Sequence, residues 1–114
     1  MKGYVYLIRA DTGHYKIGRT NNVPNRMKLF AVKLPFEFKI VHTFFCDDMI
    51  DAERQLHFIF AKKRCKGEWF KLRDREVERI KLVHHFEHQE LMRENDYGVP
   101  ELHKYLPENY FIRY

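Results

Sequence analysis

Four ionisable side chains stand out for the chemistry that they could perform together. Tyr6 and Lys16 lie on two strand-like segments joined by a short loop. If that loop has three residues, the two side chains project from one face as diagonal cross-strand neighbours. Arg26 borders the apolar stripe of a following helical segment, and Glu53 lies at the apolar edge of a later one. A phenol and a carboxylate can exchange protons, and the two cations can hold an anion.

Each of these residues also has a simpler interpretation. Tyr6 could be a strand aromatic that packs on the sheet, and Lys16 and Arg26 could be solvated charges. Glu53 could reach past its apolar neighbours to water or pair with a neighbouring cation. Their order along the chain therefore has to be considered together with the elements that carry them.

The first half of the chain predicts a hairpin followed by a helix. Residues 3–9 are β-branched and aromatic on both faces, as expected of a central strand. A three-residue loop at 11–13 leads to a second strand at 14–19. Asn and Pro residues in 20–24 predict a helix start, with the helix running to about residue 32.

The second half predicts one more strand and two helices. Residues 36–46 form the third strand, and Asp47 and Asp48 open a helix over about 49–63. A basic turn containing Gly67 follows, and a charged helix is expected over about 74–93. The fold predicted is a small α+β domain of β-β-α-β-α-α order, with a three-stranded antiparallel sheet flanked by helices. We expect the domain to span residues 1–94 and an aromatic-rich tail, residues 95–114, to pack on it or on a partner.

Composition and charge narrow the class of protein. The chain has 114 residues, of which 45% are hydrophobic, so it fits one folded domain and intrinsic disorder is excluded. Residues 1–36 and 62–81 carry +6 and +5, whereas 37–61 and 82–114 carry −3 each. Two basic blocks favour a polyanionic partner such as nucleic acid, although an ordinary solvated surface would also fit. No apolar run approaches the roughly 18 residues of a membrane span, so we expect a cytoplasmic protein with no membrane partner. Cys46 and Cys65 stand alone in the sequence, so we expect both to be free thiols.

The motifs resemble those of the GIY-YIG nuclease family. Val5-Tyr6 is similar to the end of the first motif, and Lys16-Ile17-Gly18 to the second, with Lys where Tyr is usual. Residues 15–20, Tyr-Lys-Ile-Gly-Arg-Thr, resemble a branch common in phages and large viruses. That branch also has an Arg in the next helix, a Glu with a His four residues later, and a Gly-Glu-Trp-Phe element. These are matched by Arg26, by Glu53 and His57, and by residues 67–70.

This resemblance implies a metal-dependent DNA endonuclease. It assigns Glu53 as the ligand of one Mg²⁺ or Mn²⁺ ion, since a single carboxylate suits an ion that keeps most of its waters. Arg26 would hold a nonbridging phosphate oxygen. His57, one turn after Glu53, could position a phosphate or a water, or it could only flank the core. Tyr6 would take the proton from water, with Lys16 stabilising a phenolate whose pKa is ordinarily about 10.

The DNA would be held through its phosphates, with little sequence specificity. The cations expected to contact it are Arg19, Lys28, Lys62, Lys63, Arg64 and Lys66. Two alternatives remain open: a nucleic-acid-binding module with impaired catalysis, and a viral effector that binds a host protein. A homodimer or a protein partner bound through the tail is also compatible with the sequence, and a viral protein would act in the host cytoplasm.

Overall fold

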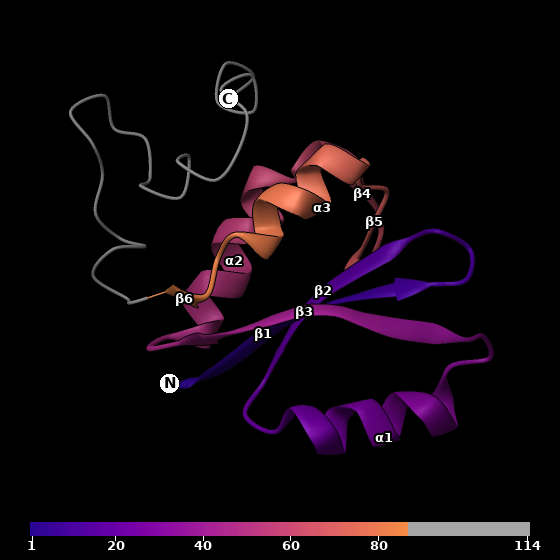
Figure 1. The fold of residues 1–114 in the computed structure, drawn as a ribbon, viewed down its shortest axis with the longest axis horizontal. Helices are drawn as coiled ribbons and strands as arrows, with labels where there is room; N and C mark the ends of the chain where they lie inside the picture. The colour runs from indigo at the N-terminus through magenta and orange to yellow at the C-terminus, as the bar shows by residue number, and fades with distance from the viewer. Residues whose placement is uncertain (87–114) are drawn as a thin grey trace.

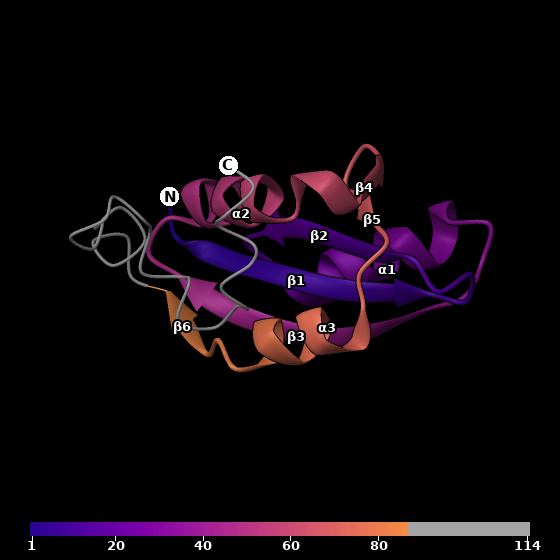
Figure 2. The same cartoon turned by 90° about the horizontal axis from the view of Figure 1, so that it is seen from above.

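A central sheet with helices on both faces organises the protein. The computed structural model describes residues 1–86, and the side chains of residues 85 and 86 are not described. Helix α1 (Val23–Lys33) covers one face of the sheet, and α2 (Met49–Ile59) and α3 (Asp74–Lys81) cover the other (Figure 1). The view in Figure 2 shows the three long strands running side by side between these layers. The α+β class predicted from the sequence is confirmed.

The sheet is wider than the three strands predicted. Its order is β4-β5-β2-β1-β3-β6, with β1 (Gly3–Ala10), β2 (Tyr15–Thr20) and β3 (Phe38–Cys46) at the centre. The short strands β4 (Arg64–Lys66) and β5 (Trp69–Phe70) extend it antiparallel on one side. On the other side β6 (His85–Phe86) pairs parallel to β3. The three-stranded prediction is therefore wrong, because strands of two or three residues are too short to show a periodic sequence pattern.

The hairpin and the first helix form as predicted. Gly13 closes the β1–β2 loop with φ of 91°, a left-handed conformation that glycine adopts without a Cβ clash. The side chain of Asn22 caps α1 by accepting a hydrogen bond from the Asn25 N–H at 3.0 Å. Asp48 caps α2 in the same way. Both helices therefore start where polar caps were expected.

Two predicted helix ends are wrong. Helix α2 ends at Ile59, and a 3-10 turn (Ala61–Lys63) replaces its expected last turn. Helix α3 ends at Lys81 instead of continuing to about residue 93, because the chain then turns to place β6 beside the end of β3. Residues 87–114, which include the predicted tail and the boundary at residue 94, lie outside the described part of the chain.

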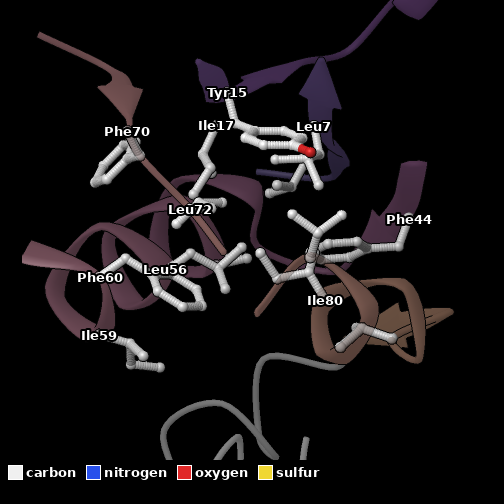
Figure 3. Close-up of a cluster of buried hydrophobic side chains, with 14 of the residues drawn as sticks. Leu7, Tyr15, Ile17, Phe44, Leu56, Ile59, Phe60, Phe70, Leu72 and Ile80 are labelled. Atoms are coloured by element: carbon white, nitrogen blue, oxygen red, sulfur yellow. The ribbon is translucent and has the colours of Figure 1, made fainter. Parts of the chain in front are cut away.

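The sheet separates two apolar clusters. The larger one joins the sheet to α2 and α3 and includes Leu7, Tyr15, Ile17, Leu56 and Phe70 (Figure 3). The smaller one, on the α1 face, consists of Tyr6, Ile8 and Phe30, with partly buried side chains around it. Residues 5–8 are buried on both faces, which confirms the prediction of a central strand. Tyr6 belongs to the smaller cluster, and its hydroxyl lies close to Gly18 of β2.

Candidate functional site

One pocket gathers most of the residues that the sequence predicts as catalytic. It has a volume of about 370 Å³ and lies beside the half of β2 that β5 does not pair with. Tyr6 comes from β1, Arg26 from α1 and Glu53 from α2, so three separate elements meet here. The residues lining the pocket are Met1, Tyr6, Arg19, Thr20, Asn21, Arg26, Met49, Glu53 and Glu68.

Glu53 is buried and only half satisfied. Its Oε1 accepts a hydrogen bond from Arg19 Nη1 at 2.7 Å, and its side chain is 9% exposed. Its Oε2 is buried and has no hydrogen-bond partner within the described residues. A buried carboxylate oxygen without a partner is costly unless a ligand satisfies it. Arg19 therefore holds one oxygen of Glu53 and leaves the other available for a cation.

Tyr6 is fully buried in the smaller cluster, and its hydroxyl likewise lacks a hydrogen-bond partner of good geometry there. Burial raises the pKa of Tyr6 well above its usual value, and the nearby carboxylates of Glu68 and Glu53 raise it further. The guanidinium of Arg26 lowers this pKa and is the cation that acts on the phenol. Tyr6 is therefore protonated at neutral pH in this structure.

Gly18 sets the position of the Tyr6 ring. The two residues are directly opposite in the β1–β2 ladder. A Cβ at Gly18 would overlap the phenol oxygen and the ring carbon that carries it. The glycine of the second motif is thus needed for the close approach of a side chain, not for an unusual backbone angle.

Lys16 lies on the face predicted for it but bonds to a carboxylate. Its ammonium is 5.7 Å from the ring centroid of Phe30, which also contacts Tyr6, so the shared face is confirmed. Lys16 Nζ donates to Glu68 Oε2 at 2.6 Å. The stabilisation of a Tyr6 phenolate by Lys16 stays a prediction.

His57 is not among the residues that line the pocket, and it flanks the core, which is one of the two positions that the sequence left open. Its Nε2–H donates to the Ile17 carbonyl at 2.8 Å, and its Nδ1 accepts from Arg64 Nη2 at 2.8 Å. Because Arg64 can only donate, this pairing requires the neutral tautomer. The ring also packs against Phe70, with centroids 5.1 Å apart. His57 ties α2 to β2 and to the edge of the sheet.

The predicted DNA-binding cations divide into three groups. Lys28, Lys62 and Lys66 are exposed and form no ion pair within residues 1–86. Lys63 is half-buried 4.0 Å from Glu76, and Arg64 bonds to His57. Arg19 is part of the pocket itself.

Sequence reasoning missed the place of Glu68, the packing role of Gly18 and the pairing of Arg19 with Glu53. Glu68 belongs to the Gly-Glu-Trp-Phe element, but only the folded chain brings it beside Lys16 and the pocket. The sequence placed Gly18 in the second motif but did not indicate that this residue packs against the Tyr6 ring. Arg19 shares strand parity with the buried Ile17 and Tyr15, a pattern that could have directed it towards α2 and Glu53.

The residues present fit a cation held by one carboxylate. Residues 1–86 contain no cluster of three or more His, Cys, Asp or Glu side chains that could hold a metal ion, so a closed structural site of the zinc type does not occur there. The unpartnered Glu53 Oε2 offers one hard oxygen ligand beside a pocket that has room for water. This donor set suits Mg²⁺ or Mn²⁺, which retain several waters.

Comparison with known proteins adds the family. The profile of the T5orf172 domain matches residues 3–85, which include every pocket residue except Met1. The chain belongs to the T5orf172 domain family. T5orf172 domains are nuclease-type domains associated with phages, so membership indicates a nuclease-like or DNA-binding role.

The other comparisons gave no relative. Neither the curated proteins nor the solved structures yielded a match to this T5orf172 domain. Within the described residues, no helix has the length and apolar character needed to cross a membrane.

Proposed function

We propose that this T5orf172 domain is a metal-dependent DNA endonuclease of the GIY-YIG type that uses one divalent cation per active site. The observation that carries the proposal is Glu53, a buried carboxylate in a polar pocket with Arg19 on one oxygen and no partner for the other. Tyr6 and Arg26 line the same pocket. Nuclease-type family membership supports the same reaction class.

Glu53 would hold the cation, which we take to be Mg²⁺ or Mn²⁺. Such an ion supplies charge stabilisation at the phosphate and at the leaving oxygen. Arg19 keeps the carboxylate in one orientation through its hydrogen bond at 2.7 Å. Holding a ligand in place in this way is the usual task of the residues around a metal site.

Arg26 and Tyr6 would act on the phosphate and on the attacking water. The permanently charged guanidinium of Arg26 is suited to a nonbridging phosphate oxygen. Tyr6 would accept the proton of the water, which requires its raised pKa to fall. Arg26 already lowers that pKa and Glu53 raises it, so neutralising the charge of Glu53 favours the phenolate. Lys16 would offset the charge of Glu68, the other pocket carboxylate that opposes ionisation.

The exposed cations Lys28, Lys62 and Lys66 would contact the DNA backbone. Such contacts give affinity that falls with salt and carries little sequence information. We propose that the protein acts in the cytoplasm, which would be that of the host cell if the protein is viral. A homodimer or a protein partner would account for specificity that this small surface does not supply.

Plasmid nicking tests the proposal. Wild-type protein with Mg²⁺ or Mn²⁺ is expected to convert supercoiled plasmid to open circles, and EDTA is expected to stop the reaction. Glu53→Gln keeps the shape of the side chain and should abolish nicking. Glu78→Gln is the matched control, since Glu78 is an exposed carboxylate on α3 that pairs only with Lys81 among the described residues.

The other outcomes identify the alternatives. Nicking that persists in Glu53→Gln would exclude Glu53 as the metal ligand. A plasmid that wild type retards on a gel at low salt but leaves intact would indicate a binding module with impaired catalysis. A protein that neither cuts nor binds DNA would fit the interaction effector.

A further inference from the structure

A second, apolar pocket lies at the hairpin end of the sheet. It has a volume of about 250 Å³ and is open to solvent in the described part of the chain. It is built from the end of β1, the β1–β2 loop, the segment before β3, and the β4–β5 ribbon. The residues lining it are Ala10, Thr12, His14, Phe36, Cys65, Lys66 and Trp69.

Two residues that are adjacent in the sequence line the two pockets. Glu68 lines the catalytic pocket and Trp69 lines the apolar one. Lys16 links them, because its ammonium bonds to Glu68 at 2.6 Å and lies 5.7 Å from the centroid of the Trp69 ring. A strand with a phosphate beside Glu68 would therefore pass close to Trp69 and the apolar pocket.

The walls suit a flat aromatic ring with a charged attachment. Phe36 and Trp69 lie with centroids 5.5 Å apart and planes at 74°, so they present a ring face and a ring edge. Thr12 and His14 complete the wall, and Thr12 Oγ1 and His14 Nδ1 are hydrogen-bonded to each other at 3.0 Å. Lys66 adds an exposed ammonium with no ion pair within residues 1–86. Aromatic faces beside a free cation are the elements with which proteins bind single-stranded nucleic acid.

Trp69 is more exposed than its neighbour Phe70, which favours a role in binding a ligand. Phe70 is completely buried in the larger cluster and has a packing role. Trp69 is only partly buried, although it is the largest side chain on this face. It is also one of the residues that line the apolar pocket.

We propose that the apolar pocket binds one unpaired nucleobase of the DNA strand, stacked on Trp69 and Phe36, next to the phosphate that is cut. This inference rests on the proposed function for the identity of the strand and deepens it. It makes the substrate DNA with an unpaired nucleotide beside the cleaved bond, such as a flap, a bubble or a single strand. Fully paired DNA would have to unstack a base to fill the pocket, which costs free energy.

Trp69 reports on its own pocket because it is the sole tryptophan of the chain. The probe is a short single-stranded oligothymidylate, added in EDTA so that no cleavage is possible. We expect it to quench the fluorescence of Trp69, and we expect the same strand with abasic sites in place of every base to bind through its phosphates without this quenching. Phe36→Ala should weaken the base-dependent binding roughly 5- to 150-fold. Lys66→Glu should weaken binding of the strand, and Arg79→Glu on α3, which covers the opposite face of the sheet, is its charge-changing control.

Equal quenching by the abasic and base-bearing strands, or no quenching by either, would overturn the inference. Equal quenching by free thymidine monophosphate at the same base concentration would also overturn it, because the pocket would then not read a strand. The test is independent of catalysis. Quenching by the oligothymidylate without cleavage of either this strand or plasmid in Mg²⁺ would remove the proposed endonuclease and keep the nucleobase pocket, and cleavage without quenching would do the reverse.

Discussion

The phenol of Tyr6 occupies the space that a side chain at Gly18 would fill. Gly18→Ala should therefore displace the ring without breaking the ladder between β1 and β2. A displacement of about 1 Å at a catalytic group can cost about 100-fold in rate, and we expect a loss of that order in nicking. Thermal unfolding of the variant checks that it folds. Thr43→Ala, which trims the other cross-strand neighbour of Tyr6, should stay near the wild-type rate, and equal rates in all three proteins would show that ring placement is unimportant.

A variant of Arg19 tests the orientation of the Glu53 carboxylate, because it keeps the charge of Glu53 itself. Arg19→Gln removes the bond to Oε1, and we expect the rate to fall about 10- to 100-fold, as for other residues that orient a metal ligand. It also removes a positive charge that opposes a cation at Glu53, so the half-saturating Mg²⁺ concentration should not rise. A Mg²⁺ titration of the nicking rate measures both quantities. A large rise in the Mg²⁺ requirement at an unchanged maximal rate would contradict this assignment.

His57 should affect stability more than catalysis. His57→Ala removes the hydrogen bond to the Ile17 carbonyl and the acceptor for Arg64, which should lower the free energy of unfolding by about 1–2 kcal/mol. The nicking rate per folded molecule should remain close to that of wild type. Urea unfolding and nicking assays check the two effects. A 100-fold slower variant of unchanged stability would instead restore the catalytic role predicted from the sequence.

Alkaline pH should weaken the fold through two buried acids. Burial raises the pKa of Tyr6 well above its usual 10.0 and that of the Cys46 thiol from 9.0 to about 12. Above pH 9 the unfolded chain loses these protons while the folded chain keeps them, so the free energy of unfolding falls with pH by up to ~1.4 kcal/mol per unit and group. Urea unfolding at a series of pH values measures this slope.

Tyr6→Phe is the matched variant for the alkaline slope. It should remove the part that begins near pH 10 and change the stability at neutral pH only through the lost interaction of the hydroxyl with the Arg26 guanidinium. The same variant should lose nicking, since it lacks the proton acceptor. An unchanged alkaline slope in Tyr6→Phe would show that the phenol ionises equally in the folded and unfolded chain.

The two cysteines should differ in reactivity. Cys46 is fully buried with a raised thiol pKa, whereas Cys65 is exposed at the rim of the apolar pocket. Because the thiolate is the reactive form, a thiol reagent should modify one cysteine rapidly in the native protein and both in urea. Cys65→Ser should remove the fast reaction. Two fast thiols in the native state would contradict the burial of Cys46.

Local sequence signals were sufficient for the hairpin, α1 and the start of α2. They predicted these elements because Gly13 adopts the left-handed conformation of the loop, and the side chains of Asn22 and Asp48 accept hydrogen bonds from N–H groups two or three residues later. The same signals failed at β4, β5 and β6. These strands exist through hydrogen bonds to distant segments, such as the pairing of Trp69 with Lys16, and their own sequences are too short to show a period.

The candidate site divides in a similar way. The residue types and their order identified Tyr6, Lys16, Arg26 and Glu53 as a set, and the fold brings all of them except Lys16 to the lining of one pocket. The sequence could not assign the partners of the ionisable groups, because a hydrogen bond depends on distances of a few ångströms between separate elements. Only the tertiary structure paired Arg19 with Glu53 and Lys16 with Glu68 and directed His57 to the Ile17 carbonyl. It also left Oε2 of Glu53 without a hydrogen-bond partner within the described residues.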